Sequence, residues 1–237
     1  MKRLFLLLAL VVAFSAFALS DPMSCSSIAG NLQAYINLGS TGCTSGNYLF
    51  SDFSFPNPSS TGGAPLPDAA TLGVTPNSNG TGITFDAALI AGPNQQVDVV
   101  IDYVVRVMSG GPITDSGLMI DAGAVNGGLV AVDETQCAGA MLPGCSGGTV
   151  TKLHADANHV LSTNTINGAS MLSISKDILV EAGAQSNSQA SISNEDQFFS
   201  NTTAPEPASL MLFGLGLVGV AFVVRREAKS ASSKTSR

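Results

Sequence analysis

The segment VDVVIDYVVRVM, residues 97–108, is the part of the sequence that most directly indicates the fold. Large apolar residues occupy every second position, and alternate residues of an extended strand face the same side. The apolar face comprises Val97, Val99, Ile101, Tyr103, Val105 and Val107. The opposite face carries Asp98, Asp102 and Arg106. This pattern predicts a strand with one face on a hydrophobic core and the other in solvent.

Six further segments have a similar length and pattern, and turn-forming Gly, Asn and Pro residues separate them. They are GITFDAALI (82–90), PITDSGLMI (112–120), GGLVAV (127–132), TVTKLHA (149–155), HVLSTNTI (159–166) and SMLSISKDILVE (170–181). Short strands at roughly ten-residue spacing predict an all-β domain, an antiparallel β-sandwich or jelly-roll-like fold. We expect one short helix within residues 27–39, and an irregular surface loop in PNPSSTGGAPLP, residues 56–67.

Both ends of the sequence differ from this middle part. Residues 1–20 combine Lys2 and Arg3, an uncharged apolar run and a small-residue exit, which is the pattern of a secretory signal peptide. Residues 208–224 contain no charge, and a basic tail at 225–237 follows at once, beginning with Arg225 and Arg226. The sequence therefore predicts an exported domain over residues 21–200, then one transmembrane helix with a cytoplasmic basic tail and Arg225 and Arg226 as its stop-transfer signal.

The exported part is strongly acidic. The whole chain has a formal charge of −7, but residues 21–204 hold fifteen Asp and Glu against three Lys and Arg, a net charge of −12. Such a surface repels polyanions, so we expect no binding to nucleic acid. Cations and neutral molecules are the expected partners.

The chain contains four cysteines, an even number, which in an exported protein predicts two disulfides. Three pairings are open. We favour Cys25–Cys43 with Cys137–Cys145, because each closes a short loop rich in Gly and Ser. A zinc site is the alternative, but none of the cysteine spacings is a C-x-x-C.

No set of residues in the sequence predicts catalysis, a cofactor or a bound metal. His154, Asp156 and His159 form HADANH, but on one strand His159 points away from the other two unless a turn at residues 157–158 intervenes. Asp98 and Asp102 share a strand face, and we expect Asp133 and Glu134 to begin a loop before Cys137. Solvated side chains are the simplest interpretation of all these residues, with weak calcium sites as an alternative.

The C-terminal segment resembles a known sorting signal. Pro205, Glu206 and Pro207, followed by a Leu- and Gly-rich span and an Arg-Arg stop within residues 201–237, are similar to the PEP-CTERM signal of exopolysaccharide-producing, mostly Gram-negative bacteria. The final segments SISKDILVEAGA and SISNEDQFFS and the Cys-to-Cys stretch near the start also resemble members of this group. The basic tail is longer than is usual for the signal.

This resemblance implies recognition by exosortase, a membrane protease-transpeptidase thought to act at the Pro-Glu-Pro region. The protein would be anchored only transiently in the inner membrane, then released or transferred to the cell surface or extracellular matrix. We therefore expect a non-enzymatic structural protein linked to exopolysaccharide and biofilm. A carbohydrate- or calcium-binding module of the cell envelope is the alternative.

Overall fold

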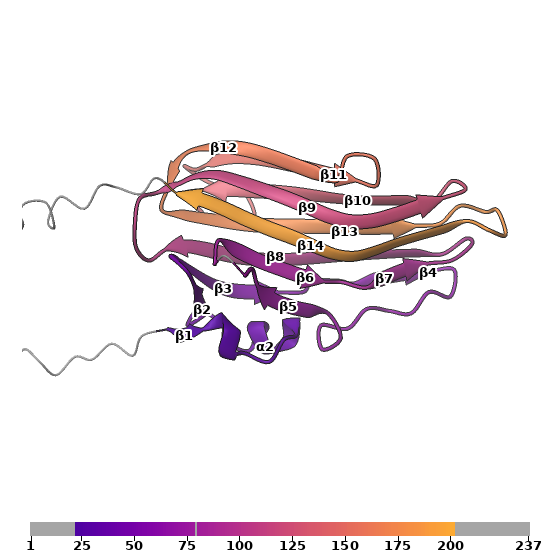
Figure 1. The fold of residues 1–237 in the computed structure, drawn as a ribbon, viewed down its shortest axis with the longest axis horizontal. Coiled ribbons are helices and arrows are strands. Elements are labelled where there is room, and N and C mark those ends of the chain that lie inside the picture. Colours follow the sequence, from indigo (N-terminus) through magenta and orange to yellow (C-terminus); the bar gives the residue numbers. More distant parts are fainter. Residues whose placement is uncertain (1–21, 79, 202–237) are drawn as a thin grey trace, which may run out of the picture. The chain divides into compact units, whose positions relative to one another are not determined.

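The computed structural model describes residues 22–78 and 80–201, which form two β-sheets packed against each other (Figure 1). The expected signal peptide and the expected transmembrane segment at 208–224 lie outside these residues. Within the described part, no helix has the length and apolar character needed to cross a membrane. The expectation of an all-β, antiparallel domain is confirmed, with one parallel pair, β1 with β2.

Sheet A has eight strands, and β8 lies near its middle, between β3 and β13. In sheet order the strands are β1 (Met23–Ser24), β2 (Cys43–Ser45), β3 (Tyr48–Ser54), β8 (Gln96–Val107), β13 (Met171–Glu181), β10 (Leu129–Ala138) and β11 (Thr149–Asp156), with β4 (Ser59–Thr61) also paired to β8. The alternation that predicts β8 is visible in its burial, since Val97, Val99, Ile101, Tyr103 and Val105 are all buried.

Sheet B has six strands and is built around β14, which pairs with β9, β6 and β7. Its strands are β12 (Leu161–Ala169), β9 (Ile113–Val125), β14 (Gln189–Asn201), β6 (Gly82–Asp86), β5 (Gly73–Pro76) and β7 (Leu89–Ala91). The core lies between the two sheets, where their alternate residues meet.

A 3-10 turn, η1 (Cys25–Ser27), and one short helix, α2 (Leu32–Ile36), precede the long strands. The helix begins at Asn31, whose side-chain oxygen accepts a hydrogen bond from the Ala34 amide at 2.9 Å. Leu32 and Tyr35 are buried, so the helix contributes one face to the core, as its spacing predicts.

Three details of the sequence interpretation are wrong. Residues 56–67 are not wholly irregular, because β4 pairs with β8 there. The segment 82–90 is two strands, since Ala88 adopts a φ of 45° between β6 and β7. Asp133 and Glu134 do not begin a loop but lie inside β10, where polar residues at inward positions hide the alternating pattern.

Candidate functional site

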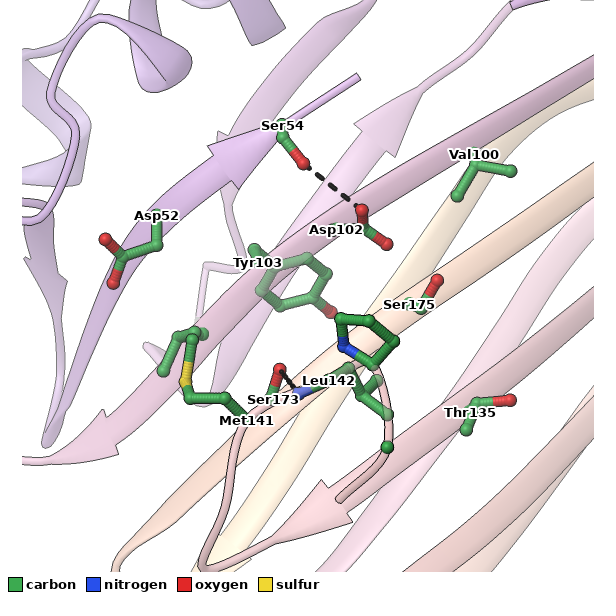
Figure 2. A pocket seen from close by; sticks show the side chains of 13 residues that line it. Asp52, Ser54, Val100, Asp102, Tyr103, Thr135, Met141, Leu142, Ser173 and Ser175 are labelled. Carbon is green, nitrogen blue, oxygen red and sulfur yellow. Dashed lines mark hydrogen bonds between the residues drawn. The ribbon is translucent and has the colours of Figure 1, made fainter. Parts of the chain in front are cut away.

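The solvent face of sheet A carries a row of polar side chains that crosses four strands. The partner register aligns Ser54 of β3 with Asp102 of β8, Asp102 with Ser175 of β13, and Ser175 with Thr135 of β10. Because these residues alternate with buried ones, their side chains face outward together. Ser54 Oγ donates a hydrogen bond to Asp102 Oδ2 at 3.2 Å (Figure 2). Hydroxyl and carboxylate groups therefore form the floor of a groove.

The loop between Cys137 and Cys145 forms one wall of this groove, which has a volume of about 530 Å³. Met141, Leu142 and Pro143 line it, with the Leu142–Pro143 peptide in the cis form. The Leu142 amide donates a hydrogen bond to Ser173 Oγ at 3.1 Å, which holds the loop over the sheet (Figure 2). The wall is apolar, and the floor combines the polar row with Val100 and Val104 of β8.

Arg106 of β8 fixes the position of Asp52, a residue that lines the groove. Its Nη1 atom donates to Ser51 Oγ at 2.7 Å and lies 3.4 Å from Asp52 Oδ2, and Asp52 lines the groove. Asp52 adopts a φ of 56° at the irregularity where the β3–β8 register shifts. This pair supplies the groove with an anchored carboxylate and a cation beside it.

A second outward row on sheet A is more acidic. Asp133 of β10 is the direct partner of Asp177 on β13, and Asp98 lies nearby on β8. Partial burial, together with the nearby charge of Asp98 and its side-chain hydrogen bond, raises the pKa of Asp177 to about 6. Like charges are thus held close together on this face, which favours a bound cation or proton.

The sequence left open a turn at residues 157–158; this turn is present, and it brings HADANH together where the chain passes from β11 in sheet A to β12 in sheet B. His154 Nδ1 lies 2.8 Å from Asp133 Oδ1, and Asp156 lies 3.5 Å from His154 and 3.3 Å from His159. The hydrogen bond with Asp133 raises the pKa of His154, and backbone amides of residues 158 and 159 lower the pKa of Asp156. Over residues 22–78 and 80–201, no group of three His, Cys, Asp or Glu is arranged to hold a metal ion.

The structure contains the two expected disulfides. Cys25 is joined to Cys43 across 18 positions and Cys137 to Cys145 across 8, which is the pairing favoured from the sequence. All four sulfurs are buried. One disulfide ties the N-terminal turn to β2, and the other closes the wall of the groove.

Sequence reasoning missed a cluster of charged and amide side chains inside the core. It comprises Glu134 and Gln136 on β10, Lys176 on β13, and Glu195 and Gln197 on β14, none more than 1% exposed. The signal that reveals it is register: Lys176 replaces an apolar residue between the buried Ile174 and Ile178. The inward position of Lys176 can be recognised only if buried and exposed residues are known to alternate along β13 on both sides of it.

The comparisons with known proteins give one sequence match, at the C-terminus. Residues 203–226 match the family model of the PEP-CTERM protein-sorting motif, which contains Pro205, Glu206, Pro207, Arg225 and Arg226 and lies outside the described residues. The motif implies an exported protein that crosses the membrane and is sorted to the surface by exosortase. The comparison with curated proteins found no match.

Three solved structures illustrate the structural likenesses. TmCBM61 in complex with beta-1,4-galactotriose is 9% identical over 73% of this chain and 99% of its own, with a TM-score of 0.27. The xylan-binding module CBM15 is 13% identical over 67% of this chain and 100% of its own, with a TM-score of 0.26. A family two carbohydrate esterase from Cellvibrio japonicus is 13% identical over 67% of this chain and 36% of its own, with a TM-score of 0.25. Scores this low carry no argument about function.

Proposed function

We propose, from the PEP-CTERM sorting motif at residues 203–226, that this chain is a structural protein delivered by exosortase to the cell surface or the extracellular matrix. In this proposal residues 1–20 are a signal peptide, 21–200 the exported β-domain, and 201–237 the sorting segment with its transient inner-membrane helix. The sorting motif is the observation that carries it. The role is architectural, linked to exopolysaccharide and biofilm, and requires no catalytic turnover.

The described domain suits such a role. Two disulfides and two tightly paired sheets give a rigid body without free cysteines among the described residues. An acidic surface keeps exported copies apart from one another and from anionic polymers, unless cations bridge them. These features would favour a domain that stays folded and soluble outside the cell.

Mass spectrometry of the protein isolated from its own host tests the sorting proposal. We expect a C-terminus upstream of Arg225 in cells that contain exosortase and an intact tail ending at Arg237 in an exosortase deletion strain. Replacing Pro205, Glu206 and Pro207 by alanine should give the intact tail in both strains. A tail that remains intact in the wild-type strain contradicts the proposal.

The groove on sheet A supports a second candidate, binding of a carbohydrate or of calcium. Its floor offers the hydroxyls of Ser54, Thr135 and Ser175 beside the Asp102 carboxylate, and such groups form hydrogen bonds with sugar hydroxyls or coordinate calcium. Glycan-array binding with and without calcium tests it. Binding that Asp102→Asn weakens and Asp121→Asn, on sheet B, leaves unchanged would place the ligand in this groove; no binding under either condition contradicts it.

A further inference from the structure

Lys176 projects from β13 into the core, where its ammonium group is surrounded by side-chain oxygen atoms. The side chains of Lys176, Glu134 and Glu195 are all 0% exposed. Glu134 is the direct cross-strand partner of Lys176, while Glu195 and Gln197 come from β14 of the facing sheet. Lys176 Nζ donates to Glu134 Oε2, and at 2.6 Å each to Glu195 Oε1 and Gln197 Oε1.

This arrangement is energetically unfavourable compared with an apolar core. One cation and two carboxylates are removed from water, and burial of unbalanced charge is strongly unfavourable. Two polar atoms, Glu195 Oε2 and Gln197 Nε2, have no hydrogen-bond partner among the described residues. A reaction that converts Lys176 and Glu134 into a neutral amide would remove the desolvation cost of two of these three charges.

We propose that Lys176 and Glu134 join in an intramolecular isopeptide bond, an amide between Lys176 Nζ and Glu134 Cδ, which the folded chain forms by itself with Glu195 as the catalytic proton carrier. The bond links β10 to β13 inside sheet A. Glu195 acts from sheet B, on the other side of the core.

The reaction balances with no external reagent. Glu195 takes one proton from the Lys176 ammonium and passes it to Glu134, so that a neutral amine faces a neutral carboxylic acid. The Nζ lone pair then attacks Cδ, the N–C bond forms, and Nζ releases a second proton to Glu195. Glu195 gives this proton to the departing Oε2 hydroxyl as the C–O bond breaks. The products are the amide and one water, and Glu195 returns to its starting state.

Gln136 is placed to support the attack. Its Nε2 amide donates to Glu134 Oε1, the oxygen that carries negative charge while the tetrahedral intermediate exists. Ser116 Oγ, at 2.8 Å, and Thr151 Oγ1, at 3.2 Å, donate to Gln136 Oε1 and so fix the direction of its amide. Oε1 then becomes the oxygen of the new amide, and Oε2 leaves.

Glu195 has the properties that the proton carrier needs. Burial, opposed by Lys176 and assisted by Glu134, raises the pKa of Glu195 to about 7, so that its acid and base forms are both accessible near neutral pH. Its Oε1 atom contacts the nucleophile while Oε2 is free to exchange the second proton. The side chains are fully buried, and strand pairing holds the reacting groups side by side, which replaces a bimolecular collision.

Glu134 is a better electrophile than Gln197, the other carbonyl group in reach. Both oxygens of Glu134 accept hydrogen bonds from N–H groups that polarise its Cδ, whereas Gln197 accepts only from Lys176 among the described residues. Attack at Gln197 would release ammonia instead of water. The two reactions therefore differ in mass and in the strands that they connect.

Tryptic mapping of the full chain, after reduction and alkylation, tests the proposal. Trypsin cleaves after Arg106, Lys152 and Lys176, so an unmodified chain yields separate peptides 107–152 and 153–176. We expect no cleavage at residue 176 and one branched species in which 107–152 is attached to the peptide that begins at 153, lighter by one water. Quantitative release of 153–176 overturns the proposal, and so does a loss of ammonia confined to the peptide beginning at 153.

Variants separate the chemistry from folding. Lys176→Arg keeps the charge but cannot form the amide, and its control, Lys152→Arg, alters an exposed lysine on β11 and should crosslink as the wild type does. Glu195→Gln leaves the Lys176–Glu134 pair electrically balanced, so the chain should fold but show at least a tenfold loss of the branched peptide. Crosslinking of Glu195→Gln at the wild-type yield would overturn the role assigned to Glu195.

Discussion

Asp177 is the described surface residue whose ionisation should affect stability most clearly. Its pKa of about 6 in the folded chain lies above the ordinary 3.8, because it is partly buried beside Asp98. Between these two values the folded state binds more protons than the unfolded state, so ionisation of Asp177 lowers stability as pH rises from about 4 to about 6. Above that range the full penalty is present.

Asp177→Asn should therefore stabilise the protein at pH 7. We expect the free energy of unfolding in urea to rise by about 1 kcal/mol, a value reduced from the full shift because the side chain is exposed to solvent. The gain should disappear below pH 4. Asp121→Asn, at an exposed position of β9, is the control; an equal gain from both variants, or a gain at pH 3.5, contradicts the assignment.

The same residues show where sequence reasoning succeeds and where it stops. The outward position of Asp98 and Asp102 follows from the alternation in residues 97–108. The proximity of Asp98 to Asp177 does not, because it depends on the β8–β13 register, in which the paired residues are 65 to 85 positions apart in the chain. Glu134 is harder still, because an inward charge looks like a polar residue of a loop. Lys176 lies in a segment expected to be a strand, but its charge hides its inward position.

Among the secondary-structure elements, the first strands depend most on a covalent link. β1 has two residues and β2 has three, which is too few for strong pairing. Cys25 and Cys43 tie η1 to β2 beside the Tyr35 hydroxyl, which donates to the Cys25 carbonyl at 3.3 Å. The sequence predicts the short helix here but not β1 and β2. A strand of two or three residues is too short to show an alternation of apolar and polar residues.

Replacing Cys25 and Cys43 together by serine should destabilise the protein by about 3 kcal/mol. Without the disulfide, which spans 18 positions, the unfolded chain gains conformational entropy. Hydrogen exchange should show lost protection in residues 23–45 and little change in β8 and β13. The matched variant, with Cys137 and Cys145 replaced, opens a loop of only 8 positions and should cost less and act at the groove wall. Uniform loss of protection in the first variant would contradict a local role.

At the scale of the whole molecule, the dominant physical property is the excess negative charge of residues 21–204. The fifteen carboxylates repel one another, and only three Lys and Arg offset them. Among the described residues there are few ion pairs, and four of them are weak contacts of Arg106 or histidine at the surface. Salt screens such repulsion over about 10 Å at 0.1 M. Stability should thus depend on ionic strength in the direction opposite to that of a protein held by surface ion pairs.

We expect the Tm at pH 7 to rise by roughly 2–4 °C between 10 and 500 mM NaCl, equivalent to about 1 kcal/mol for a domain of this size. The rise should vanish near pH 4, where many carboxylates are protonated and the net charge is small. Calcium distinguishes general screening from a site: at equal ionic strength, screening alone gives the same Tm with CaCl₂ as with MgCl₂. A saturable rise in Tm with calcium only, abolished by Asp102→Asn, would show that sheet A binds the cation specifically. A Tm that falls as NaCl increases would contradict charge repulsion as the main electrostatic effect on stability.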